Sequence, residues 1–383
     1  MSLLCLSGSD VARVATKFSP EDLQMLMAHV FYTLTRNNTE NPTSYTPPRI
    51  TFPTQNHTAL FMPARIVATP QTQMLHGTSI KVVCVPTSPA DQRGLPASTL
   101  VLNEETGAVK AILNASNLTA LRNAAGSLLS CTLVGPHQPV NIVVFGAGAQ
   151  IASHLDLFLR AFPSIQACTI VNRSVNERVS NLAALLRSRF PAVQISSLAH
   201  DASTASTDSD SDAAAKVKDA LLSAHLIICA TSSTTPLFPA AWVRARTHVI
   251  LIGSYKPTMH EIDAELVRRA LPSSFPSHLN ARACLLVDSR AACLAEAGEL
   301  IGAGIDGSEV LEIGERVETD EHNKLLLVKR HPSSAEADEE LESTVGPITI
   351  FKSVGVGLQD VAIACAVVQK ADELGIGNRV DWA

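Results

Sequence analysis

The chain has 383 residues, of which 46% are hydrophobic and 17% charged, and its formal net charge is −6 at pH 7. This length predicts two domains, each able to bury its own core, and the acidic balance argues against binding to nucleic acid or to an anionic membrane. No apolar run approaches the roughly 18 residues of a membrane-spanning helix. The N-terminus lacks the basic start and apolar segment of a signal peptide. We therefore expect a cytoplasmic protein.

The eight cysteines are scattered, and none forms a Cys-x-x-Cys pair. Several lie in apolar, strand-like runs, where a cysteine behaves as a small hydrophobic residue in a reducing compartment. The twelve histidines form no cluster, and His260-Glu261 has no second histidine four residues on. The sequence therefore favours neither a disulfide framework nor a metal site.

The first third of the chain predicts a mixed α+β arrangement. Residues 20–35 have a helical pattern with Ser19 as a suitable N-cap, and Leu118 to Leu133 predicts a second helix. Extended runs between the two helices predict strands at 49–52, 58–62, 79–85, 99–103 and 108–113.

Three cations in this region are candidate substrate-binding residues. Lys81 lies within Ser-Ile-Lys-Val-Val-Cys-Val (79–85), a run otherwise suited to burial, and a buried lysine requires an anionic partner or a cleft. Arg49 follows two prolines, and Arg122 lies on the helix with small residues. Three cations facing a cleft would suit a substrate carboxylate. By periodicity alone, each also fits a surface side chain that lays its stem along apolar residues.

A glycine-rich turn follows at residues 142–150. The β-branched run Ile142 to Phe145 enters a turn with Gly146 and Gly148, and an amphipathic helix leaves it near Ala149 and Gln150. Strand, glycine turn and helix in this order are typical of a dinucleotide-binding corner, where the helix N-terminus faces a pyrophosphate. Such turns also occur by chance in α/β proteins.

From Val140 onward strands and helices alternate. The strand candidates are 141–145, 167–172, 193–197, 225–230, 248–253 and 283–288. This alternation predicts a right-handed, doubly wound parallel sheet. Two polar stretches, 201–212 and 333–343, have the composition of solvated surface insertions.

In dinucleotide-binding folds, the residues at the end of the second of these strands usually determine whether NAD or NADP binds. Here it reads Asn172-Arg173-Ser174, with no carboxylate to hold a ribose and an arginine able to pair with a 2′-phosphate. This favours NADPH over NADH, although Arg173 also fits a surface arginine at a strand end. Thr231 and Ser232 after the fourth strand and Ser254 after the fifth are further candidate cofactor contacts, or else belong to ordinary turns.

The tail becomes apolar again from Ile348 and continues into a helical pattern over 358–371. Because six strands already complete the nucleotide-binding sheet, we expect the tail to rejoin the N-terminal domain. The expected fold is therefore an α/β protein in which a Rossmann-type, doubly wound parallel sheet over 125–344 is inserted into a split α+β domain, 1–124 plus 345–383.

These motifs resemble the ornithine cyclodeaminase and mu-crystallin family over nearly the whole chain. The matching elements are Phe61-Met-Pro-Ala64, Lys81, Gly94-Leu-Pro96 with Thr106-Gly107, Leu121-Arg-Asn-Ala-Ala125, Gly146-Ala-Gly-Ala-Gln150 with His154, Asn172-Arg173, Val287-Asp-Ser289, Glu296-Ala-Gly-Glu299, and Phe351-Lys-Ser-Val-Gly355 with Asp360. The two polar insertions are foreign to the family.

The resemblance implies a homodimer whose split domain binds the substrate and forms the dimer sheet, while the inserted Rossmann domain binds NAD(P). It implies that Arg49, Lys81 and Arg122 clamp the carboxylate of the substrate. The family motif usually has threonine after this last arginine, where the chain has Asn123. We include Asn123 and Ser353 among the expected cofactor contacts.

Tyr255 is the most informative departure from the family. Cyclodeaminases carry an aspartate at the matching position, and members without it resemble NADPH-dependent reductases of cyclic ketimines. Deamination needs a base at this point, whereas reduction of a protonated imine needs mainly a held carboxylate and a well-placed nicotinamide. Lys81 and Tyr255 are candidate proton donors.

We therefore expect an NADPH-dependent reductase that converts Δ1-pyrroline-2-carboxylate or Δ1-piperideine-2-carboxylate to proline or pipecolate by hydride transfer to C2. Two alternatives stay open. The first is an ornithine or lysine cyclodeaminase or a related amino-acid dehydrogenase, for which Glu261 is the only nearby carboxylate. The second is a mu-crystallin-like protein that binds NADPH or a small ligand without turnover.

Overall fold

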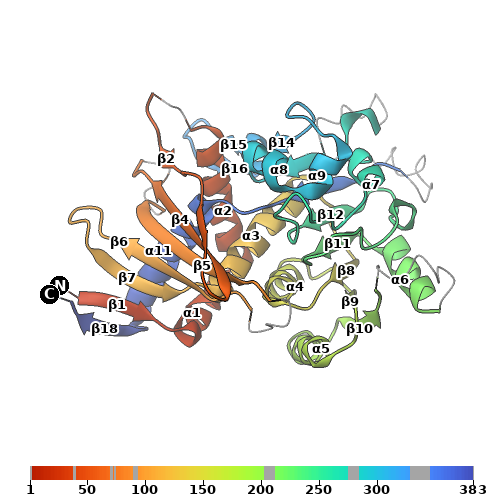
Figure 1. Cartoon of the computed structure of the whole chain (residues 1–383), viewed down its shortest axis with the longest axis horizontal. Helices are drawn as coiled ribbons and strands as arrows, with labels where there is room; N and C mark the ends of the chain where they lie inside the picture. The colour runs from red at the N-terminus through yellow and green to blue at the C-terminus, as the bar shows by residue number, and fades with distance from the viewer. Residues whose placement is uncertain are drawn as a thin grey trace. The chain divides into compact units, whose positions relative to one another are not determined.

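The computed structural model describes residues 2–37, 40–69, 72, 75–88, 94–201, 212–274, 284–327 and 346–382. The chain divides into two compact units (Figure 1). The first comprises Met1–Gly126, Thr319–Leu326 and Gly355–Ala383, and the second Ser127–Glu318 and Leu327–Val354. Nearly all of the predicted insertion at 201–212, and the whole of that at 333–343, lie outside the described residues.

The first unit is built on a mixed sheet with the strand order β18-β1-β7-β6-β5-β4-β2, and β3 also pairs with β4. The strands are β1 (Ser2–Leu6), β2 (Ser44–Tyr45), β3 (Ile50–Pro53), β4 (His57–Ile66), β5 (Gly77–Pro86), β6 (Ala97–Leu102), β7 (Val109–Asn114) and β18 (Asn378–Asp381). Strands β4 to β7 form an antiparallel meander. Because β1 pairs with β18, both ends of the chain lie at one edge of the sheet (Figure 1).

The helices of the first unit are α1 (Gly8–Ala15), α2 (Pro20–Thr35), α11 (Gly357–Leu374) and the first part of α3 (Ser116–Val134). A capping box between Ser19 and Asp22 begins α2, so the predicted helix and its N-cap are confirmed. Helix α11 packs on β4, β5 and β6 and against α2, and most of its residues are buried. A nearly continuous apolar sequence suits such a central helix.

The described residues of the second unit form an eight-stranded sheet with the order β10-β9-β8-β11-β12-β17-β13-β14. The strands are β8 (Asn141–Phe145), β9 (Ala167–Asn172), β10 (Gln194–Ala199), β11 (Leu226–Cys229), β12 (His248–Leu251), β13 (Leu285–Val287), β14 (Leu311–Glu312) and β17 (Thr349–Lys352). All of the strand pairs are parallel. The chain order reverses at β8, so the predicted doubly wound sheet is confirmed, with a switch point between β8 and β11.

Helices join the strands of this sheet. They are the end of α3, α4 (Ala149–Ala161), α5 (Glu177–Arg189), α6 (Asp212–Ser223), α7 (Ala264–Arg268), α8 (Arg290–Glu296) and α9 (Gly298–Ala303), with 3₁₀ turns at Ala240–Trp242, Pro272–Ser274 and Ile313–Arg316. A two-stranded sheet pairs β15 (Glu318–Thr319) with β16 (Leu325–Leu326). No helix within the described residues is long and apolar enough to cross a membrane.

The tail departs from the expectation at β17. The sequence places residues from 345 onward with the N-terminal domain, whereas β17 pairs with β12 and β13 in the second sheet. The first unit resumes only at Gly355. Chain order does not reveal this insertion, because β17 fills the space between two strands that precede it in the sequence. Strands β1 and β18 and helix α1 are additions to the predicted elements.

Candidate active site

Lys81 is buried in strand β5, where 2% of the residue is exposed. Its neighbours across the sheet are Met62 of β4 and Thr99 of β6. The Nζ atom of Lys81 lies 2.7 Å from Oδ2 of Asp360, in the first turn of α11. The lysine in an apolar strand therefore has the anionic partner that burial requires.

Asp360 also binds Arg122 and thus joins two of the three predicted cations. Arg122 Nε donates to Oδ1 of Asp360 at 3.2 Å, and its Nη1 donates to Gln359 Oε1 at 2.9 Å and to Asn123 Oδ1. Gly355 has φ +85°, and a β carbon there would lie 2.7 Å from the guanidinium nitrogens. Glycine is therefore needed for the guanidinium to lie against this backbone.

The electrostatics of the group follow from its burial. Burial lowers the pKa of Lys81 from 10.5 to about 8, Asp360 opposes the shift, and the charges of Arg122 and Arg49 add to it. Burial alone would raise the pKa of Asp360, but Lys81 and Arg122 outweigh it and the pKa is lowered. One ionised carboxylate is thus shared by cations that outnumber it, and Lys81 can exchange a proton near neutral pH.

Arg49, the third predicted cation, immediately precedes β3 and is half-buried. Ile50 pairs with Phe61, and the next residue of β4, Met62, pairs with Lys81. The charge of Arg49 accordingly acts on the pKa of Lys81. In the first unit, the charges of two of the predicted cations, Arg122 and Arg49, therefore both act on the third, Lys81.

The glycine turn of the second unit lies between β8 and α4. Gly146 has φ +108°, and a β carbon there would lie 3.1 Å from the carbonyl oxygen of Ala230. Gly148 is the N-cap of α4 and makes no side-chain cap contact, and a β carbon there would meet no atom within 4 Å. The N-terminus of α4, which begins at Ala149 and Gln150, therefore has open space beside its N-cap glycine, which fits a phosphate group.

The predicted cofactor selector lies beside this turn. Gly146 N donates to the carbonyl oxygen of Val171 at 2.8 Å, which fixes the turn against the end of β9. Asn172 ends β9, and its Nδ2 donates to the carbonyl oxygen of Ser174 at 2.9 Å. Arg173 and Ser174 are exposed. An exposed guanidinium at this strand end is able to pair with a phosphate group.

Glu261 holds together the chain segments that follow β11 and β12. Its Oε1 accepts from Thr231 N at 2.7 Å and Thr231 Oγ1 at 3.0 Å, and its Oε2 accepts from Gly253 N at 2.7 Å. A β carbon on Gly253 would lie 1.8 Å from the carbonyl oxygen of Thr231, so only glycine permits this approach. Ser232 is exposed beside it. Glu261 therefore fixes the rim of the sheet, and both of its oxygens are engaged.

Two of the expected cofactor contacts bind protein groups at this rim. Ser254 is fully buried, and its Oγ donates to the carbonyl oxygen of Met259 at 2.8 Å. Ser353 Oγ donates to Oδ2 of Asp288 at 2.7 Å. Tyr255 is half-buried at the rim. The Ser254 hydroxyl thus stabilises the segment that carries Tyr255, whereas the Ser353 hydroxyl joins the end of β17 to the residue that follows β13.

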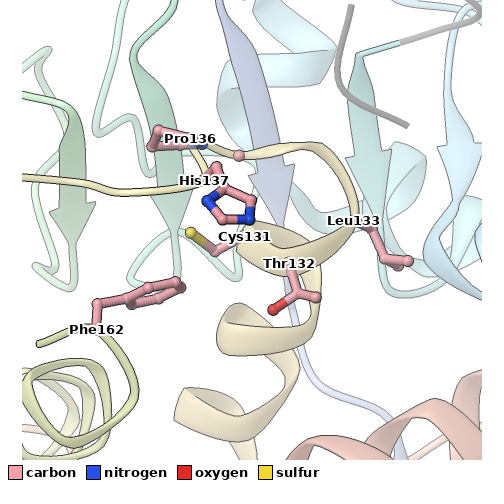
Figure 2. A pocket seen from close by; sticks show the side chains of 7 residues that line it. Cys131, Thr132, Leu133, Pro136, His137 and Phe162 are labelled. Carbon is pink, nitrogen blue, oxygen red and sulfur yellow. The ribbon is translucent and has the colours of Figure 1, made fainter. Parts of the chain in front are cut away.

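A pocket at the C-terminal end of α3 lies apart from the residues described above (Figure 2). The lining residues are Cys131, Thr132, Leu133, Gly135, Pro136, His137 and Phe162. None of the predicted site residues is among them, so the pocket contributes nothing to the chemistry described above. Within the described ranges, no group of three or more His, Cys, Asp or Glu side chains is arranged to hold a metal.

The sequence by itself assigns no structural role to the two carboxylates that organise these sites. It offers Asp360 only as part of a family motif and Glu261 only as a substitute base. The signal that could have found them is a charged residue inside an apolar run. Asp360 interrupts such a run in α11, and Lys352 ends another in β17. A buried lysine elsewhere in the chain then requires a buried acid as its partner.

A doubly wound parallel sheet with an open glycine turn, joined to an α+β unit with buried cations, defines a two-unit α/β protein of the Rossmann type. Comparison with known sequences narrows this class. The chain belongs to the ornithine cyclodeaminase/mu-crystallin family, whose sequence model matches residues 14–307.

Individual relatives agree with this assignment. A protein of Dictyostelium discoideum named as an uncharacterized cyclodeaminase is 29% identical over an alignment of 308 residues, and the alignment covers 76% of this chain and 74% of that protein. A Delta(1)-pyrroline-2-carboxylate reductase of Bacillus cereus is 26% identical over 349 residues, 88% of this chain and 89% of that protein.

A solved structure shows the same fold. The Delta(1)-pyrroline-2-carboxylate reductase of Thermococcus litoralis, in complex with NADH and L-proline, superposes with a TM-score of 0.73 at 21% sequence identity. The superposition covers 98% of this chain and 100% of that one.

Proposed function

We propose that the chain is an NADPH-dependent reductase of cyclic imino acids, which converts Δ1-pyrroline-2-carboxylate or Δ1-piperideine-2-carboxylate to proline or pipecolate. The observation that carries this proposal is the buried joining of Lys81 and Arg122 by Asp360, with the charge of Arg49 acting on the same group. The family, and the relatives named as pyrroline-2-carboxylate reductases, support the substrate class.

The cations would hold the carboxylate of the substrate. Lys81 and Arg122 share the single carboxylate of Asp360, which leaves one positive charge that a substrate carboxylate would balance. Because Asp360 already fixes Lys81 and Arg122, their side chains lose little freedom on binding. This preorganisation would orient the adjoining C=N bond of the substrate.

The second unit would hold the cofactor, whose bound nicotinamide ring supplies the hydride. Gly146, Gly148 and the first amides of α4 fit its pyrophosphate. Arg173 supports a preference for NADPH, because it is exposed at the end of β9 in a segment that has no carboxylate.

The reaction also requires a proton on the ring nitrogen of the imine. Lys81 can supply it, because burial lowers its pKa to about 8 and both of its forms are therefore accessible near neutral pH. The hydride then adds to the adjoining carbon, and the product is the cyclic amino acid. Tyr255 is a second candidate donor at the rim of the other unit.

The test follows NADPH absorbance with imines made from the corresponding D-amino acids. We expect turnover by the wild-type chain and its loss in Lys81→Ala. Lys110→Ala is the matched control, because Lys110 is an exposed lysine on β7 of the same sheet. The proposal fails if neither imine is reduced, or if Lys81→Ala retains full activity.

Cyclodeamination is the main competing outcome. It would need a base near Tyr255, and both oxygens of Glu261 are occupied by backbone amides and a hydroxyl. Formation of proline from ornithine without added reductant would overturn the reductase assignment. Tight NADPH binding without turnover on a panel of imines would instead favour the ligand-binding role.

We also propose that the first unit binds the substrate and forms a homodimer, while the second binds the cofactor. Ile50 and Phe52 of β3 are 59% and 46% exposed, and such apolar side chains are suited to burial between subunits. Light scattering of the purified protein tests this proposal, and a monomer at micromolar concentration would contradict it.

A further inference from the structure

A group of buried charged side chains lies under the carboxyl ends of β12 and β17 in the second unit. Lys352, the last residue of β17, is fully buried, and its Nζ lies 3.1 Å from Oε1 of Glu299 on α9. The same Nζ donates to the carbonyl oxygen of Ser254 at 2.5 Å. The ammonium therefore joins α9 to the rim segment that follows β12.

Two more carboxyl groups share this environment. Glu261 is fully buried, and burial is the main cause that raises its pKa; the charge of Lys352 lowers this pKa, and the charge of Glu299 raises it. Asp288, directly after β13, is 1% exposed and accepts hydrogen bonds from Ser353 Oγ and from the backbone amide of Ser289. The group thus contains three carboxyl groups and one ammonium, and the carboxyl groups of Glu299 and Asp288 alone outnumber the ammonium of Lys352.

Among the described residues, Lys352 is the cation whose charge acts on Glu261 and on the Cys229 and Cys293 thiols. Burial raises the pKa of the Cys229 and Cys293 thiols well above 9, so both stay uncharged. Arg269, another buried cation of this unit, donates to the carbonyl oxygens of Ala240 and Gly346. Gly346 precedes β17, so this arginine lies at the opposite end of that strand. The carboxyl ends of the strands therefore carry a surplus of buried negative charge.

We propose that this surplus selectively stabilises the oxidised, positively charged nicotinamide ring over the reduced, neutral ring, and so strengthens the bound reduced cofactor as a hydride donor. The inference rests on the proposed function to the extent that it requires a nicotinamide cofactor at this edge of the sheet, where doubly wound folds bind their ligands. A fixed charge in a buried site is weakly screened, so it acts on the ring without direct contact.

Glu299→Gln is the informative variant, because it removes one negative charge and keeps an oxygen that can accept from Lys352. We expect the ratio of the Kd for NADP⁺ to the Kd for NADPH to rise by about tenfold, which is ~1.4 kcal/mol. The double variant Glu299→Gln/Lys352→Met restores the wild-type charge, so its ratio should return toward the wild-type value. Glu265→Gln, an exposed change on α7, should leave the ratio unchanged.

The measurement is calorimetric titration of the full chain with each cofactor form and no substrate, after unfolding curves have shown that each variant folds. Asp288→Asn provides an independent charge removal if the double variant does not fold, and it should shift the ratio in the same direction. If neither form binds to the wild type, the proposed function itself fails. If both forms bind and the ratio stays constant in Glu299→Gln, or if the single and double variants shift it equally, the inference is refuted.

Discussion

Replacing Asp360 by asparagine should leave Lys81 and Arg122 without their shared counter-ion. Removing one partner of a buried ion pair costs about 3–5 kcal/mol, because a buried charge is left uncompensated. Lys81 can relieve part of this cost by losing its proton, since Asp360 is the group that holds its pKa up to about 8 against burial. The variant should therefore have a Lys81 pKa below 8.

The sign of the pH dependence follows from proton linkage. The unfolded chain has a lysine pKa near 10.5, so it binds more protons than the folded wild type between about pH 8 and pH 10.5, and stability rises with pH across that window. In Asp360→Asn the window begins at lower pH. The stability deficit of the variant is the free energy of unfolding of the wild type minus that of the variant. For each unit by which the Lys81 pKa falls, this deficit should be about 1.4 kcal/mol smaller at pH 9 than at pH 6.

The assay is denaturant unfolding of the wild type and the variant at pH 6 and pH 9, with the pH profile of imine reduction measured in parallel. Activity that requires protonated Lys81 should decline at lower pH in the variant. Asp372→Asn is the matched control on α11, because Asp372 forms an exposed pair with Arg379 that should be worth at most about 1 kcal/mol. An equal deficit at both pH values, with an unshifted activity profile, would refute the reasoning.

Further predictions concern the second unit. Burial lowers the pKa of His154 to about 4 and that of His248 to about 3. Because these histidines take up protons below about pH 6.5 only in the unfolded chain, the free energy of unfolding should fall by about 3 kcal/mol per histidine by pH 4. Thermal unfolding at a series of pH values measures this loss, and a flat profile would count against it. Arg173→Ala should raise KM for NADPH about tenfold or more and leave KM for NADH nearly unchanged, whereas equal changes in steady-state assays would exclude a 2′-phosphate contact. Gly253→Ala places a β carbon 1.8 Å from the carbonyl oxygen of Thr231, so it should cost more than about 3 kcal/mol in denaturant unfolding, and wild-type stability would contradict the close approach.

The sequence predicts the architecture well wherever periodicity and local signals agree. The capping box at Ser19, the glycine turn at Gly146 and the apolar strands after it are local features, and the structure has the corresponding helix, turn and parallel sheet. Strand β17 shows the limit of this reasoning. Its apolar run indicates a buried strand, but its position between β12 and β13 depends on packing between segments far apart in the chain.

The same distinction between local features and long-range packing applies to the candidate sites. The sequence identifies Lys81 and Arg122 as cations that need a partner, but the partner, Asp360, lies more than 200 residues further along the chain. It reaches them because α11 packs on the sheet that contains β5. Glu261 is the opposite case. The sequence suggests it as a possible base, but both of its carboxylate oxygens accept hydrogen bonds in the structure.

By itself, the sequence determined which segments form strands and helices, where the glycine turn between strand and helix lies, and which charged residues could not be buried alone. These properties depend on side-chain chemistry and on spacing over a few residues. The tertiary structure decided which acid meets which cation, where β17 enters the sheet, and that buried carboxyl groups gather at the carboxyl ends of the strands. Those outcomes depend on long-range packing, because the energy of a buried charge is set by whatever the fold brings within a few ångströms of it.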